Sequence, residues 1–124
     1  MNILNDNFQL YKSLKDICFE IFNFTENIPR KYLYIKSGIE VSLTTSIKLV
    51  RYYIVNKNET YRIRIKYLKD LIVELSMIDF YFDFMYNKKY LGKNRYSDFS
   101  LKLESIRRIA YGVINSEKKQ CEIQ

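Results

Sequence analysis

The apolar residues of this chain recur mainly at intervals of three and four, the spacing that places side chains on one face of an α-helix. Over residues 7–26 this face carries five apolar positions, Leu10, Leu14, Ile17, Ile21 and Phe24. Pro29 then interrupts the pattern, because proline disfavours a helical conformation in the residue before it and is accepted in the first turn of a following helix. The pattern therefore predicts one helix over residues 7–26 and a second helix that starts at Pro29 or Arg30.

The second predicted helix runs as far as the polar residues 56–58, which end it. Its apolar face is formed by Ile39, Leu43, Ile47, Val50 and Ile54. Lys48 lies on the opposite face. Gly38 stands inside this helix, where glycine costs about 1 kcal/mol of helix propensity relative to alanine. We expect Gly38 to mark a close contact with a neighbouring helix.

The third predicted helix begins near Thr60, a residue suited to the N-cap, and it has two apolar faces. The first face carries Tyr61, Ile65, Leu68, Ile72, Leu75 and Phe82. The second face, more than a quarter-turn away, carries Val73, Met77, Phe80 and Phe84. Because a surface helix of a small monomer needs only one apolar face, we predict that the second face is an interface between the subunits of a homo-oligomer.

Residues 87–95 contain Gly92 and four basic residues, and they are predicted to form a loop. Ser97 is expected to cap a fourth helix, whose apolar face consists of Phe99, Leu103, Ile106, Ala110 and Val113. Four amphipathic segments with short connections predict an all-α fold, an antiparallel up-down-up-down four-helix bundle. The expected divisions are a flexible N-terminus over residues 1–6, the bundle over 7–116 and a polar C-terminal tail over 117–124.

Composition narrows the possible chemistry. The chain has 124 residues, of which 48% are hydrophobic, enough for one domain with a single core. It has no His, which excludes Ser–His and Cys–His catalytic pairs and histidine-bearing metal sites. Asp79 and Asp83 share a helix face but lack the Glu and His partners of a di-iron bundle, and Cys18 is expected to be a buried thiol. We therefore expect no enzymatic activity, no metal and no cofactor.

The cysteines and the apolar stretches bear on the cellular compartment. Cys18 and Cys121 lie far apart and form no CxxC pair, and charged residues interrupt the most apolar stretch, residues 71–85. These features predict a cytoplasmic protein with no disulfide and no helix that spans a membrane.

The positive charge of the chain is concentrated in one segment. The net charge is +7, and residues 48–69 alone hold seven cations against one acid, Glu59, a local balance of +6. Arg64 is one of the seven, and the other six are the candidate contacts to nucleic acid or to a polymerase: Lys48, Arg51, Lys57, Arg62, Lys66 and Lys69. Three of these share one face of the third predicted helix, so several cations can meet one phosphate backbone. The alternative interpretation is a solvated helix face with weak ion pairs.

Two segments resemble the accessory variability determinant proteins of diversity-generating retroelements. The sequence Ile28-Pro29-Arg30-Lys31-Tyr32-Leu33-Tyr34 is similar to the Pro-Arg/Lys and spaced aromatic residues that open the family's second helix. Residues 103–114 are similar to the Leu-x-x-Ile-x-Arg-x-x-x-Gly-hydrophobic-Ile pattern that ends its fourth helix. The matching positions are Pro29, Arg30, Tyr32, Tyr34, Arg108 and Gly112.

The resemblance implies a non-catalytic four-helix bundle that assembles as a homopentamer. It also implies two partners, the reverse transcriptase of the same element and nucleic acid (RNA or DNA), in mutagenic reverse transcription from a template RNA and in retrohoming. It adds Arg30 and Arg108 to the candidate contacts. Two alternatives remain: a bundle protein of the kind encoded in ribosomal RNA intervening sequences, whose Pro-x-Asn-Ile-Ala-Glu-Gly signature is missing here, and a protein–protein adaptor without nucleic-acid binding.

Overall fold

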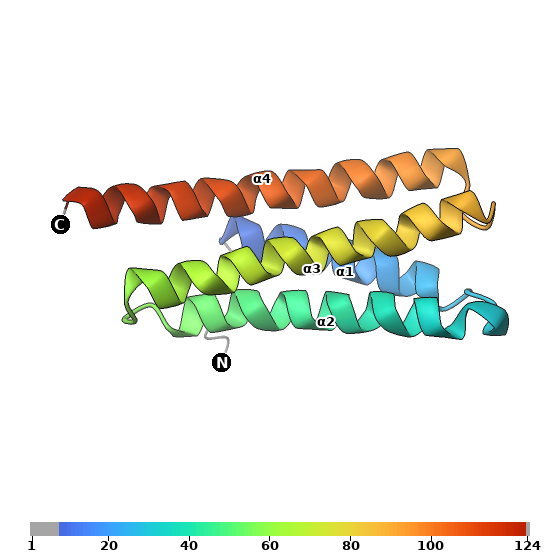
Figure 1. The fold of residues 1–124 in the computed structure, drawn as a ribbon, viewed down its shortest axis with the longest axis horizontal. Helices are drawn as coiled ribbons and strands as arrows, with labels where there is room; N and C mark the ends of the chain where they lie inside the picture. Colours follow the sequence, from blue (N-terminus) through green and yellow to red (C-terminus); the bar gives the residue numbers. More distant parts are fainter. Residues whose placement is uncertain (1–7, 124) are drawn as a thin grey trace.

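The computed structural model describes residues 8–123, and the expectation for residues 1–6 lies outside this range. Its helices are α1 (Gln9–Thr25), the short 3-10 helix η1 (Arg30–Tyr32), α2 (Leu33–Val55), α3 (Tyr61–Asn87) and α4 (Lys93–Ile123). Consecutive α-helices run in opposite directions, and α1 also packs against α4, which closes the bundle (Figure 1). The predicted all-α, up-down four-helix bundle is therefore confirmed, with α1 diagonal to α3 and α2 diagonal to α4.

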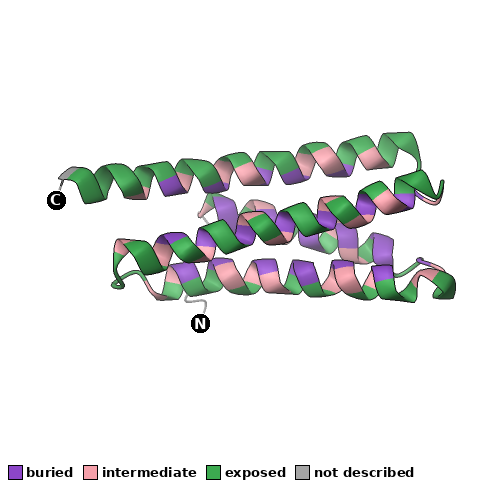
Figure 2. Ribbon diagram, in the orientation of Figure 1, coloured by how far each residue is buried: buried purple, intermediate pink, exposed green. Residues whose placement is uncertain are grey.

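The core lies along the bundle axis, where each helix contributes one face (Figure 2). The largest side chains with almost no exposed surface are Leu10, Leu14, Ile21, Ile39, Leu43, Leu68, Leu71, Leu75, Ile78, Phe82, Met85 and Phe99. Most of the predicted face of α3 is buried, but Tyr61 and Ile72 keep part of their surface. Leu71 and Ile78, which were not predicted, are buried as well. The buried face of α3 is therefore wider than predicted and includes Leu71 and Ile78 beside the expected line.

The connection between α3 and α4 is shorter than predicted. It spans residues 88–92, and α4 starts at Lys93, four residues before Ser97, so Ser97 is not the N-cap that the sequence suggested. Lys89 has a φ of 62°, the left-handed conformation with which many helices end. The backbone N–H groups of Tyr90 and Leu91 donate to the Met85 carbonyl, which closes the end of α3.

The last turns of α4 correct a second boundary. The helix was expected to end near Ser116, but it continues to Ile123 and projects beyond the neighbouring helices (Figure 1). Glu117 holds this segment to the bundle, because its carboxylate pairs with Arg64 of α3 and accepts a hydrogen bond from the Tyr53 hydroxyl of α2 at 2.5 Å. The guanidinium of Arg64 also lies over the Tyr53 ring, 4.4 Å from its centroid.

The expected close contact at Gly38 is present. A Cβ atom at this position would overlap Cζ of Tyr81, so the Tyr81 ring occupies the space that any other residue would need. Glycine thus allows α2 and α3 to pack closely through this ring. Within the part of the chain that the structure describes, no helix combines the length and the apolar character needed to cross a membrane.

Candidate nucleic-acid interface

The side chains considered for chemistry have structural partners. Burial raises the pKa of the Cys18 thiol to about 12, which leaves it protonated at neutral pH. Asp79 pairs with Arg107, and the Tyr96 hydroxyl donates to Asp83. Burial raises the pKa of Asp79, and the charge of Arg107 opposes that shift. Within residues 8–123 no group of three His, Cys, Asp or Glu residues could hold a metal ion.

The six cations predicted between residues 48 and 69 lie on the outer surface of α2, α3 and the turn between them, here called the α2–α3 basic surface. They are Lys48, Arg51, Lys57, Arg62, Lys66 and Lys69. All six are exposed, and within the described chain none of them forms an ion pair. These charges are therefore available to a partner, and exposure without ion pairs fits both a phosphate-binding surface and the alternative of a solvated helix face.

Along α3, three of these cations form a short row. Arg62, Lys66 and Lys69 are separated by four and three residues, so they project from nearly the same side of the helix. Seven residues of α-helix rise about 10 Å, and phosphates follow one another about every 3.4 Å along one strand of a duplex. The row therefore spans about three phosphates of one strand.

Two tyrosines join the cations of α2 to those of α3. The ring of Tyr52 on α2 stacks on that of Tyr67 on α3, with centroids 5.4 Å apart and planes 22° apart. The ammonium of Lys48 lies 5.7 Å from the centroid of Tyr52, which is itself exposed. Neither tyrosine was among the predicted site residues, although the spacing of four residues from Lys48 to Tyr52 places the two on one face of a helix.

Arg51 extends the surface toward α1. Its guanidinium donates a hydrogen bond of 2.9 Å to the Tyr11 hydroxyl and lies over the Tyr11 ring. This contact orients Arg51 without pairing it with an acid. The result is a surface that combines exposed cations with one exposed aromatic ring, Tyr52, and the partly buried Tyr67 beneath it. Cations beside aromatic rings are the combination used to bind single-stranded nucleic acid.

Three other basic residues lie apart from this surface. Arg64 is turned inward to Glu117. Arg30 is in η1, at the opposite end of the bundle from Lys57, so the structure does not bring it together with the other candidates. Arg108 is exposed on α4, the helix diagonal to α2, where it pairs with Glu104 one turn away. Arg30 and Arg108 are thus separate sites.

The second apolar face of α3 is exposed as predicted at three of its four positions. Val73 and Phe80 keep 58% and 59% of their surface and Met77 keeps 37%. Phe84 differs, because the ring of Tyr32 packs edge-on against it with centroids 6.4 Å apart and half-buries it. With about 100° of rotation per residue, these apolar positions continue the row of Arg62, Lys66 and Lys69 on the same side of α3.

Comparison of the chain with models of protein families, with curated proteins and with solved structures finds no match. The basis for a function therefore lies in the molecule's own surfaces. These are the unpaired cations and tyrosines of the α2–α3 basic surface, and the exposed apolar side chains that follow them on α3.

Proposed function

We propose that this protein is a non-catalytic accessory protein of a diversity-generating retroelement, which binds the element's reverse transcriptase and nucleic acid during mutagenic reverse transcription. The observation that carries the nucleic-acid part is the α2–α3 basic surface, with six exposed cations and no ion pair among them in the described chain. The motifs around Arg30 and Arg108 support the choice of element through their resemblance to the accessory variability determinant family.

The physical argument for nucleic acid concerns the ions that accompany phosphates. Each phosphate that a protein cation neutralises releases a condensed counterion into solution, which drives binding and makes it depend on salt. A cation already paired with a carboxylate contributes little to this effect, and the cations of the α2–α3 basic surface are not paired. Stacking of bases on exposed aromatic rings adds about 1–3 kcal/mol per base, and Tyr52 stands among these cations.

We further propose that the protein forms a homo-oligomer through the outer face of α3. Val73, Met77 and Phe80 are large apolar side chains exposed next to one another along this helix, and contact with another subunit would remove them from water. The ring number of five follows only from the family resemblance. In such an assembly the row of Arg62, Lys66 and Lys69 would lie beside each subunit boundary, because it is on the same side of α3 as the apolar residues.

The nucleic-acid part is tested by replacing Arg62 and Lys66 with Glu and measuring RNA binding at several salt concentrations. Loss of two phosphate contacts should weaken binding and reduce the slope of log affinity against log salt by about 1.4 for a single strand. Lys118→Glu with Lys119→Glu is the control, because both lysines are exposed on α4 and the charge change is the same. Equal binding by the parent and the Arg62/Lys66 variant would refute this role.

The polymerase part requires a separate measurement. Co-expression with a reverse transcriptase of this class of element, followed by purification after nuclease treatment, should recover a complex that does not depend on RNA as a bridge. If the only complexes recovered are with acidic proteins, and RNA binding is absent, the adaptor interpretation replaces the proposal.

A further inference from the structure

The positive charge of this protein gathers at both ends of the bundle. Residues 26–33 and 87–95 together hold six cations and one acid, Glu26, while residues 48–69 hold seven cations and one acid. The rest of the chain has eight cations and twelve acids, a balance of −4. A chain with a net charge of +7 therefore consists of two basic regions with an acidic remainder.

The first two of these segments are far apart in sequence but form one surface in the fold, here called the basic end: Arg30, Lys31, Lys88, Lys89, Lys93 and Arg95. Tyr90 joins them, because its hydroxyl donates to the Asn27 carbonyl at 2.8 Å and its ring lies against that of Tyr32, with centroids 5.9 Å apart. All six cations are exposed, and within the described chain none forms an ion pair.

The basic end is distinct from the α2–α3 basic surface. Arg30 precedes α2 and Lys57 follows it, so the length of this helix separates the two, about 35 Å for 23 residues (Figure 1). Between them, Lys102 pairs with Glu20 and Arg107 with Asp79, and the acids of this part of the chain outnumber its cations. Because the intervening surface is acidic overall, it repels a phosphate backbone, and the two basic regions do not merge into one continuous track.

Aromatic rings lie directly under the cations of the basic end. Lys31 lies over the Tyr32 ring at 5.2 Å and Lys88 over the Phe84 ring at 5.6 Å. The guanidinium of Arg95 lies 5.4 Å from the centroid of Phe24. Aromatic faces with cations beside them can receive both the base and the phosphate of a nucleotide.

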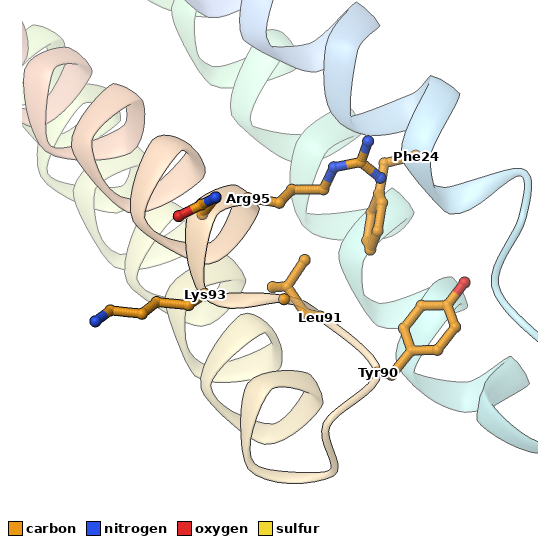
Figure 3. Close-up of a pocket in the computed structure, with 7 residues that line it drawn as sticks. Phe24, Tyr90, Leu91, Lys93 and Arg95 are labelled. Atoms are coloured by element: carbon orange, nitrogen blue, oxygen red, sulfur yellow. The ribbon is translucent and has the colours of Figure 1, made fainter.

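A recess of about 410 Å³ opens at this end between α1 and the start of α4. Phe24 and Tyr90 form its aromatic walls and Arg95 reaches across it toward Phe24, whereas Lys93 extends away from the recess into the surroundings (Figure 3). Its volume lies within the range of about 300–1,000 Å³ that is typical of small-molecule sites, so it has room for one unpaired base.

We infer that the basic end is a second binding surface for single-stranded nucleic acid, so that one subunit holds two strands, or two segments of one strand, separated by the rise of α2 from Leu33 to Lys48, about 22 Å. The phosphates contact the six cations and a base enters the recess beside Phe24 and Tyr90. This inference rests on the proposed function, because the first strand is the one bound by the α2–α3 basic surface. It assigns the accessory protein the task of holding a template and a product strand near each other.

The test counts the strands bound by each subunit at saturation, with a short oligoribonucleotide that reaches only one surface. The end variant combines Arg30→Gln, Lys89→Gly and Lys93→Gln. Glycine suits the left-handed backbone at Lys89, so this substitution removes a charge and relieves strain at once, and a loss of binding cannot be ascribed to a disturbed turn. The control is Lys118→Gln with Lys119→Gln.

We expect about two strands per subunit for the parent and the control, about one for the end variant, and about one for the Arg62/Lys66 variant, since each surface contributes roughly one short site. An end variant with the stoichiometry and salt slope of the parent overturns the inference and leaves the proposed function intact. One strand per subunit in the parent likewise overturns the inference and leaves the proposed function intact. A parent that binds no RNA instead overturns the proposed function.

Discussion

Glu117 should control how firmly the last turns of α4 are attached to the bundle. Its carboxylate and the guanidinium of Arg64 form an ion pair in which the side chains keep only 15% and 17% of their surface. The Tyr53 hydroxyl donates to the same carboxylate. Burial, with the hydrogen bond to Glu117, raises the pKa of Tyr53, so this hydroxyl remains a donor up to strongly alkaline pH. We consider the variant Glu117→Gln, which keeps the shape of the side chain and an acceptor for Tyr53.

The Glu117→Gln variant loses stability because it leaves the charge of Arg64 without its partner. Removal of one partner from a fully buried ion pair costs about 3–5 kcal/mol, because the other charge is left without compensation. Some water reaches both side chains here, and Tyr53 keeps its partner, so we expect about 2–3 kcal/mol. For a domain of this size each kcal/mol lowers Tm by roughly 4 °C, which predicts a decrease in Tm of about 10 °C.

Thermal unfolding followed by circular dichroism measures this decrease. Glu122→Gln is the matched control, since this residue is exposed on the same helix and its loss should change Tm by less than about 2 °C. A second variant, Arg64→Met with Glu117→Gln, removes both charges and should recover part of the lost stability. If Glu117→Gln unfolds at the temperature of the parent, then the last turns of α4 do not depend on this pair and the reasoning is wrong.

Three further predictions concern the surface, the helix contact and the core. Met77→Asp with Phe80→Asp should convert the proposed oligomer into a smaller folded species in light scattering, because an unpaired carboxylate buried at an interface costs several kcal/mol. A monomeric parent would contradict the proposed assembly. Gly38→Ala should give no gain in unfolding free energy, because the new methyl group meets the facing tyrosine ring. Gly112→Ala, with open space around it, should gain about 1 kcal/mol, and equal gains at both positions would refute the close contact at Gly38. The free energy of unfolding should fall as pH rises from 9 toward 12, by up to about 1.4 kcal/mol per pH unit, because the folded state keeps the Cys18 proton that the unfolded state releases. Cys18→Val should lack this contribution. An identical alkaline profile for the variant and the parent would refute the role of Cys18.

The periodicity of apolar residues was sufficient to predict the class of the fold. Helices follow from the periodicity of apolar residues because burial requires the same side of each helix to face the axis, and this rule is local. Gly38 was recognised as a contact for a similar reason, since a helix interior accepts glycine only at a cost. The charge of residues 48–69 was also visible, because cations without nearby acids in sequence have few local partners.

Tertiary structure decided the features that depend on distant segments. The last turns of α4 look like a polar tail in sequence, but Glu117 finds Arg64 on another helix, and that long-range pair favours helix where composition indicated none. Arg30 was grouped with the other candidate cations, yet the length of α2 places it at the other end, with residues of the α3–α4 connection. Phe84 was predicted to be exposed on the second apolar face of α3, but the ring of Tyr32 covers part of it. In each case a residue's role depends on which side chain faces it across the bundle, and spacing along one helix contains no information about that partner.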